Sequence, residues 1–404
     1  MEFYHDILEN LLDKLIDYRG KTPKKTLSGV PLVTAKIVKN GTINGYTEYI
    51  AEEDYDKWMV RGFPKVGDVI LTTEAPLGEV ALLKEEKVAL AQRIVCLRGK
   101  DNVLDNTYLK YYLQSGKGQK SLSARESGTT VTGIKQAELR RVDIEYPAYD
   151  DQRRIASILS SLDRKIELNN KINADLEEMA QAIFKNWFVD FEPFKDGKFV
   201  DSELGMIPEG WKVGRLEDIA NIVGGSTPSK AKPEYYTQKG IAWLTPKDLS
   251  SHPAVYSSRG EIDITQEGYN STSTKLMPRG TVLFTSRAPI GYISIAQNDI
   301  CTNQGFKSLV PRKAGTCFLY CFLKYVTPEI ENKSTGSTFK EASGALMKSL
   351  QVIMPEQKVF EEFEEIVSPL FARIESLEKE NSRLSLLRDT LLPRLMSGEI
   401  EVPE

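Results

Sequence analysis

Hydrophobic residues recur along two stretches of the chain in alternating steps of four and three. In the first stretch, the recurring positions are Leu162, Ile166, Asn169, Asn173, Leu176, Ala180, Ile183 and Trp187. Adding 208 to each number gives a second set in the same register: Leu370, Ile374, Leu377, Asn381, Leu384, Arg388, Leu391 and Leu395. A sustained period of 3.5 residues is typical of helices that pack in a coiled coil. The pattern therefore predicts two long helices, one in each half of the chain.

Because one chain supplies both helices, we expect them to pack against each other in antiparallel orientation. Asn173 and Asn381 stand at the same position of the repeat, and an asparagine in such a seam fixes register at a cost in stability. Antiparallel packing need not align these two side chains, so their direct pairing is left open. The alternative is two unrelated helices that each cover their own globular unit. The 3.5-residue period favours pairing, since a surface helix usually has a wider stripe of period 3.6.

The segment before each helix is also duplicated. Runs typical of strands occupy residues 69–73 (VILTT) and 282–286 (VLFTS), and each is followed by Pro-x-Gly, at 76–78 and 289–291. A repeat this long is a duplicated domain. We predict a mixed α/β (α+β) fold with two similar globular units, each followed by a long helix. The predicted boundaries are 1–147 and 201–355 for the globular units and 148–200 and 356–404 for the helical segments.

The net charge of −4 conceals a segregation of charge along the chain. The first globular segment, residues 1–147, carries a net charge of +1, and residues 211–355 of the second carry +6. The helical segments are acidic, with −5 over residues 148–210 and −6 over residues 356–404. The globular units can therefore approach a polyanion, whereas the helices are suited to contacts with protein.

The chain offers little material for catalysis. It has only two histidines, and it contains neither a GxxxxGK[ST] phosphate loop nor a dinucleotide-binding GxGxxG. Glu85-Glu86-Lys87 downstream of Asp68 could be forced into a nuclease pattern, but a solvated hairpin turn accounts for it better. We predict a non-catalytic chain without a metal site. The four cysteines and the absence of a long apolar run favour a cytoplasmic protein that does not enter a membrane.

Polar and basic residues recur at matching loop positions of the two globular units. Lysine and arginine can neutralise phosphates, while glutamine, threonine and arginine can read base edges. The predicted DNA-binding residues are Lys24, Lys25, Thr34, Lys36, Thr73, Arg93 and Thr129 in the first unit, and Lys230, Thr245, Lys247, Thr285, Ser286, Arg287, Gln304 and Lys340 in the second. Any one of them could be a solvated surface residue, and it is their repetition that supports the set. Differences such as Glu74 against Arg287 fit two units that read different sequences.

Four segments, in this order, resemble those of the specificity (S) subunits of type I restriction–modification systems. They are DQRRIA (151–156), SELGMIPEGW (202–211), GGSTPS (224–229) and LLPRLMSGEI (391–400). The first unit departs from the pattern, because it begins at Met1 without the Gly-Trp-Lys that opens the second. The resemblance implies two target-recognition domains, each reading one half of an asymmetric, bipartite site in double-stranded DNA. It also implies that the helices act as a spacer and dock two methyltransferase (M) subunits.

On this interpretation the chain itself binds no cofactor. The M subunits would carry S-adenosylmethionine, clamp the duplex and flip the target adenines. Restriction (R) subunits would join through the M subunits and supply cleavage driven by ATP and Mg²⁺. One added helical turn of about four residues would lengthen the spacer by about 6 Å, close to two base pairs. The alternatives are a coiled-coil scaffold whose repeated units bind protein, or a nuclease or methyltransferase in its own right.

Overall fold

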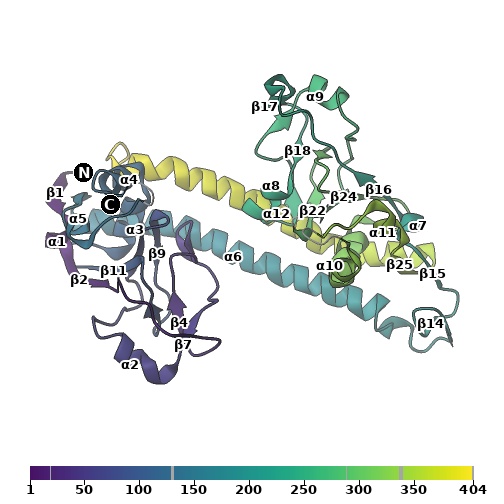
Figure 1. Ribbon diagram of the computed structural model, residues 1–404, viewed down its shortest axis with the longest axis horizontal. Helices are drawn as coiled ribbons and strands as arrows, with labels where there is room; N and C mark the ends of the chain where they lie inside the picture. Colours follow the sequence, from purple (N-terminus) through teal and green to yellow (C-terminus); the bar gives the residue numbers. More distant parts are fainter. Residues whose placement is uncertain (19, 129–131, 288, 336–339, 403–404) are drawn as a thin grey trace. The chain divides into compact units, whose positions relative to one another are not determined.

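The computed structural model describes residues 1–18, 20–128, 132–287, 289–335 and 340–402 (Figure 1). The chain divides into two compact units. Unit 1 comprises Met1–Ile166 and Ser382–Glu404, and unit 2 comprises Glu167–Asn381. The two long helices, α6 (Tyr149–Phe188) and α12 (Gln357–Met396), each contribute one part to unit 1 and the other part to unit 2. The predicted ranges follow the order of the chain, whereas each compact unit takes segments of both long helices.

Unit 1 is built around a four-stranded antiparallel sheet with the order β2-β11-β8-β9. These strands are β2 (Leu12–Asp17), β11 (Ile94–Gly99), β8 (Val69–Thr73) and β9 (Leu77–Leu82). Two further strands, β1 (Phe3–Ile7) and β12 (Asp143–Pro147), pair antiparallel, and β4 (Val30–Val33) pairs parallel with β10 (Ala89–Leu90). All five residues of β8 are buried, so this strand is the centre of the unit.

Unit 2 repeats this topology with one additional strand, β19, paired parallel to β22. Its main sheet has the order β16-β24-β21-β22-β19. The strands are β16 (Ala220–Gly224), β24 (Lys307–Pro311), β21 (Val282–Ser286), β22 (Ile290–Ala296) and β19 (Tyr256–Ser257). The antiparallel pair is β15 (Lys212–Arg215) with β25 (Gln351–Met354), and the parallel pair is β18 (Trp243–Leu244) with β23 (Cys301–Thr302). The predicted duplication and its matching strands, β8 and β21, are thereby confirmed.

The remaining elements are short, apart from α10. In unit 1 they are α1 (Leu8–Leu11), β3 (Lys25–Thr26), β5 (Val38–Lys39), β6 (Thr42–Ile43), β7 (Tyr49–Ile50), the 3-10 turn Glu52–Asp54, α2 (Tyr55–Trp58), α3 (Asn106–Gln114), α4 (Gly116–Ser123) and α5 (Gln136–Arg140). In unit 2 they are the 3-10 turns Glu192–Phe194 and Pro233–Tyr235, β13 (Phe199–Val200), β14 (Ile207–Pro208), α7 (Leu216–Ile219), β17 (Tyr236–Thr237), α8 (Pro246–Ser251), β20 (Asp263–Ile264), α9 (Gln266–Asn270), α10 (Thr316–Lys333) and α11 (Gly344–Ser349).

Repeated glycines mark turns that both units need. Gly67 and Gly280 precede β8 and β21 with φ of 86° and 85°. Gly78 and Gly291, near the starts of β9 and β22, have φ of 95° and 98°. Side chains with a Cβ rarely adopt this left-handed region, so the glycines keep the same backbone path in both copies.

The parts of α6 and α12 within unit 2 pack in antiparallel orientation (Figure 1). Near one end of the contact, Asn169 bonds to Asn381, and near the other Phe184 and Phe188 pack on Phe363. The predicted antiparallel pairing is confirmed for this unit, but Asn381 bonds to Asn169 and not to Asn173. All predicted seam positions are buried or half-buried: Leu162, Ile166, Asn173, Leu176, Ile183, Leu370, Ile374, Leu377, Asn381, Leu384 and Leu391.

The helical segments of unit 1 are held by charge as well as by apolar packing. Asp163 of α6 accepts hydrogen bonds from Lys110 and Tyr111 of α3, at 2.8 Å and 2.5 Å, and from Arg388 of α12 at 2.9 Å. Burial alone would raise the pKa of Asp163, but these three donors hold it below its ordinary value. The same burial lowers the pKa of the Lys110 ammonium. One carboxylate thus joins α3 and both long helices within this unit.

Candidate nucleic-acid interface

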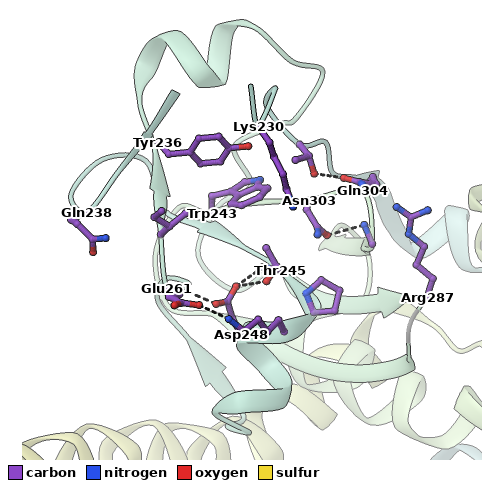
Figure 2. Close-up of a pocket in the computed structure, with 15 residues that line it drawn as sticks. Lys230, Tyr236, Gln238, Trp243, Thr245, Asp248, Glu261, Arg287, Asn303 and Gln304 are labelled. Atoms are coloured by element: carbon purple, nitrogen blue, oxygen red, sulfur yellow. Dashed lines mark hydrogen bonds and ion pairs between the residues drawn. The ribbon is translucent and has the colours of Figure 1, made fainter. Parts of the chain in front are cut away.

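Unit 2 has a surface cleft of about 770 Å³, formed by the loop before β17, the start of α8 and the β23–β24 turn (Figure 2). Five of the predicted DNA-binding residues line it: Lys230, Thr245, Lys247, Arg287 and Gln304. They come from separate segments between residues 230 and 304, so folding gathers side chains that the sequence scatters. The structure thus forms one polar, partly cationic surface from the predicted set.

Two aromatic side chains, Trp243 and Tyr236, line the wall of this cleft. Their rings meet edge to face, with centroids 5.9 Å apart and planes inclined by 66°. The Trp243 indole N–H donates to the Ser226 carbonyl at 3.1 Å, and the Tyr236 hydroxyl donates to the Pro228 carbonyl at 2.6 Å. Burial raises the pKa of Tyr236, so the hydroxyl keeps its proton for this bond. The two aromatic residues therefore fix the loop that carries Thr227.

Gln304 is exposed at the tip of the turn between β23 and β24. Its side-chain oxygen accepts a hydrogen bond from the Thr227 hydroxyl, which orients the amide. The turn is held from within, because Asn303 accepts from the Gly305 N–H at 2.8 Å and its own N–H donates to the Leu244 carbonyl at 2.9 Å. An amide presented in a fixed orientation can make the paired contacts with which glutamine reads adenine.

Charge at the rim of the cleft is only partly compensated. The Asp248 carboxylate is bound to the backbone, since it accepts hydrogen bonds from the Thr245 N–H at 2.7 Å and from the Glu261 N–H at 2.9 Å. Lys247 forms an ion pair of 2.9 Å with Glu261, which raises the pKa of the exposed lysine. Lys230 is exposed in the cleft, and Arg287 is half-buried on the side where Gln304 lies (Figure 2). Among the described residues, no cluster of histidine, cysteine, aspartate and glutamate is suited to hold a metal ion.

Three predicted residues are buried within the central strands. Thr73 and Thr285 are 1% and 0% exposed, and Ser286 is also 0% exposed. The Thr285 hydroxyl accepts from the Tyr292 N–H at 2.8 Å, and the Ser286 hydroxyl donates to the Gly305 carbonyl at 3.2 Å. These side chains serve the sheet, so they are withdrawn from the candidate interface. Lys340 is exposed and donates to the Glu331 carbonyl at 3.2 Å, while Thr129 lies outside the described residues.

The predicted residues of unit 1 occupy the equivalent loops. Lys24 and Lys36 are exposed, Thr34 is half-buried, and Lys25 pairs with Glu48 at 2.7 Å. Arg93 follows β10 as Gly305 follows β23. Their carbonyls accept from the same strand position, since the Thr73 N–H donates to Arg93 and the Ser286 N–H to Gly305, both at 2.8 Å. The two units therefore present corresponding turns with different side chains.

Comparison with known proteins identifies this duplicated fold. The family model described as the type I restriction modification DNA specificity domain matches residues 13–178 and again residues 208–386. The chain belongs to this family. It is a DNA-specificity subunit of the type I restriction–modification class, which is a role in recognition, not in catalysis.

The relatives cover 70% to 95% of this specificity subunit. It is 30% identical over 408 residues to the type I restriction enzyme MjaIX specificity subunit of Methanocaldococcus jannaschii, covering 95% of this chain and 91% of the relative. The HindI specificity subunit of Haemophilus influenzae is 27% identical over 342 residues, covering 70% of this chain and 74% of the relative. The crystal structure of the type I S subunit from M. genitalium superposes with a TM-score of 0.60 at 19% identity, covering 100% of this chain and 97% of that chain, which supports the fold.

Sequence reasoning missed several cleft residues of the specificity subunit. Trp243, Tyr236 and Asn303 line the cleft, but the prediction rests on residues that repeat between the units. Leu32 takes the place of Trp243 in unit 1, as the pairing of β4 with β10 and of β18 with β23 shows. The sequence carries one usable signal, since Trp243 stands two residues before Thr245, where the run Thr-Pro-Lys-Asp begins.

None of the helices in the described part of the chain is both long enough and apolar enough to cross a membrane.

Proposed function

We propose that this specificity subunit reads a bipartite, asymmetric site in double-stranded DNA, one half with each unit. The observation that carries the proposal is that equivalent surface positions of a duplicated fold bear different side chains. Gln92-Arg93 in unit 1 stands where Gln304-Gly305 stands in unit 2, and Glu74 stands where Arg287 does. Two recognition surfaces built on one backbone plan, with different readers, suit two unlike half-sites.

The cleft of unit 2 is the candidate surface for one half-site. Lys230 and Lys247 supply charge for phosphates, and Gln304 and Arg287 supply hydrogen bonds for base edges. Trp243 is buried, and its indole N–H holds the loop that carries Thr227 through the Ser226 carbonyl. Lys24 and Lys36, with Gln92 and Arg93, are the corresponding candidates in unit 1.

The long helices of the specificity subunit are the candidate docking surface for two M subunits. The stretches that contain them, residues 148–210 and 356–404, carry net charges of −5 and −6, which disfavour contact with DNA and leave the helices for protein partners. In this assembly S-adenosylmethionine would be held by the M subunits, and ATP with Mg²⁺ by R subunits that join through them. The expected setting is the cytoplasm. The helical pair would also set the gap between the half-sites.

The test is co-purification with a candidate M subunit followed by mapping of methylated adenines on genomic DNA. We expect a gapped, two-part motif that disappears when this chain is omitted. A Lys230→Ala/Lys247→Ala double variant should weaken binding at all sites alike and reduce the salt dependence, whereas Lys198→Ala, at an exposed position outside the cleft, should not. Methylation that persists unchanged without the chain, and a complex that does not form, would contradict the proposal and favour a protein-binding scaffold.

A further inference from the structure

A charge inversion distinguishes the two units at the end of their central strands. Glu74 follows β8 and Arg287 follows β21. Both positions form the same backbone pairing: Glu74 bridges to Gly133, which bridges to Ser127, and Arg287 bridges to Glu341, which bridges to Thr335. The inversion therefore lies on equivalent backbone, and not on loops that merely look alike.

Each unit completes an ion pair at this place, but from different positions. In unit 1, Glu74 lies 3.8 Å from the Nε of Arg93, on the turn after β10. In unit 2, Arg287 lies 3.7 Å through Nη1 from Glu341, which Lys307 also approaches at 3.5 Å. The arginine side chains are 51% and 37% exposed, so each guanidinium is accessible to a ligand while a carboxylate orients it.

In each unit a glycine stands where the other unit has one member of its ion pair, and a side chain there would clash with neighbouring atoms. A Cβ at Gly133, the counterpart of Glu341, would stand 2.9 Å from the Thr73 carbonyl oxygen and 3.3 Å from the Cβ of Glu74. A Cβ at Gly305, the counterpart of Arg93, would stand 2.9 Å from Pro246. Each unit is thus built to supply one arginine, from the turn after β10 in unit 1 and from the end of β21 in unit 2.

We propose that Arg93 and Arg287 are the guanine-reading residues of their units, each setting one G·C position in its own half-site. This inference rests on the proposed function. Arginine reads guanine through a bidentate contact to O6 and N7, and the carboxylate contact in each unit leaves two guanidinium nitrogens for it. A glutamine accompanies each arginine: Gln92 precedes Arg93, and Gln304 shares the cleft with Arg287 (Figure 2). The guanine should therefore lie beside the base that the glutamine contacts.

The experiment maps adenine methylation by the full complex with wild-type chain, Arg93→Ala, Arg287→Ala and Arg287→Lys. We expect Arg287→Ala to accept any base at one G·C position of one half-site, with discrimination reduced about 5- to 150-fold. Arg93→Ala should relax one position of the other half-site only. Arg287→Lys keeps the charge without the planar fork, so it should relax the same position while overall affinity is retained. Lys198→Ala, at an exposed position, is the matched control and should leave the motif intact.

Three results would overturn the inference while leaving the proposed function standing. One is a wild-type motif in which a half-site lacks any G·C pair. Another is uniform loss of methylation in Arg287→Ala with no new base accepted, which indicates a phosphate contact. The third is a motif that stays unchanged in both arginine variants. If the wild-type complex produces no gapped motif at all, the proposed function itself is wrong.

Discussion

The side-chain amide of Asn169 donates a hydrogen bond of 2.8 Å to the side-chain oxygen of Asn381, across the antiparallel pair formed by α6 and α12 in unit 2. Asn169 also donates to Glu380 at 2.8 Å, and Asn381 donates to Asn170 at 2.8 Å. Asn169 is fully buried, so its nitrogen depends on these partners. Sliding the helices by one turn would break all three bonds, and the layer therefore specifies their register.

Because of these asparagine hydrogen bonds, a single substitution should lower stability and a double substitution should restore it. Asn169→Leu leaves Asn381 without its donor and should lower stability by about 1–3 kcal/mol. Asn169→Leu with Asn381→Leu replaces the bond by apolar contact and should recover the loss. Thermal melts of the two variants and of Lys171→Ala, an exposed control on the same helix, test this. A single variant as stable as the double would show that the bond does not stabilise the helix pair.

Because of Glu378, the folded protein should become less stable as pH rises. Burial raises its pKa from 4.5 to about 7, although the carboxylate accepts from the Val255 and Tyr256 N–H groups at 2.7 and 3.0 Å. The folded state therefore binds a proton more tightly than the unfolded state, and stability should decline between pH 4.5 and 7. Glu378→Gln keeps an acceptor and should flatten this part of the profile.

The control for the Glu378 profile is Glu365→Gln, at an exposed position of the same helix α12. Its melting temperature should follow the wild-type pH dependence. The measurement is the thermal midpoint at half-unit steps from pH 4.5 to 8. Parallel curves for wild type and Glu378→Gln would refute the assignment.

Asp163 in unit 1 should have the opposite effect, so that the protein loses stability as pH falls. Because its pKa is held below 3.8, it contributes stability above that pH, which is lost as pH falls through the folded value. Asp163→Asn leaves Lys110, which is 5% exposed, without its carboxylate and should cost about 2–4 kcal/mol at pH 7. Asp175→Asn, exposed on the same helix, should cost little. Urea unfolding at pH 7 and pH 3 measures both, and an equal loss at the two pH values would contradict the account.

Helix length predicts the gap of the DNA site. Because α6 and α12 pair antiparallel, both must be extended together to keep the seam, by seven residues after Ile166 and seven after Asn381. Seven helical residues add about 10 Å, which equals about three base pairs. Methylation mapping should show the same half-sites with a gap about three base pairs longer. An unchanged gap would exclude the helical pair as the spacer.

The helices could be predicted from the sequence because their signal is local. The steps between Leu162 and Trp187 define which face is buried, and the structure buries or half-buries that face. The heptad pattern does not define the axial offset of antiparallel helices. For that reason the sequence leaves the pairing of Asn173 with Asn381 open, and packing brings Asn381 to Asn169.

The candidate interface was less predictable, because repetition selects structural and functional residues alike. Thr73 recurs as Ser286 because the central strand needs both inside, where the Ser286 hydroxyl donates to the Gly305 carbonyl. Trp243 has no aromatic counterpart in unit 1 and escaped a search for repeats. Contacts such as Thr227 with Gln304 join residues 77 positions apart, which no local pattern reveals.

The reciprocal glycines at 133 and 305 constrain how specificity can evolve. Exchanging the unit 1 arrangement for that of unit 2 requires Glu74→Arg and Gly133→Glu together. Glu74→Arg alone places a second cation near Arg93, and Gly133→Glu alone forces a side chain against the Thr73 carbonyl oxygen. The charge repulsion lasts until a carboxylate is added, and the clash at position 133 with the Thr73 carbonyl oxygen is relieved by neither step. Drift by point mutation is therefore obstructed at this position, and replacement of a whole recognition unit is the route that bypasses the barrier.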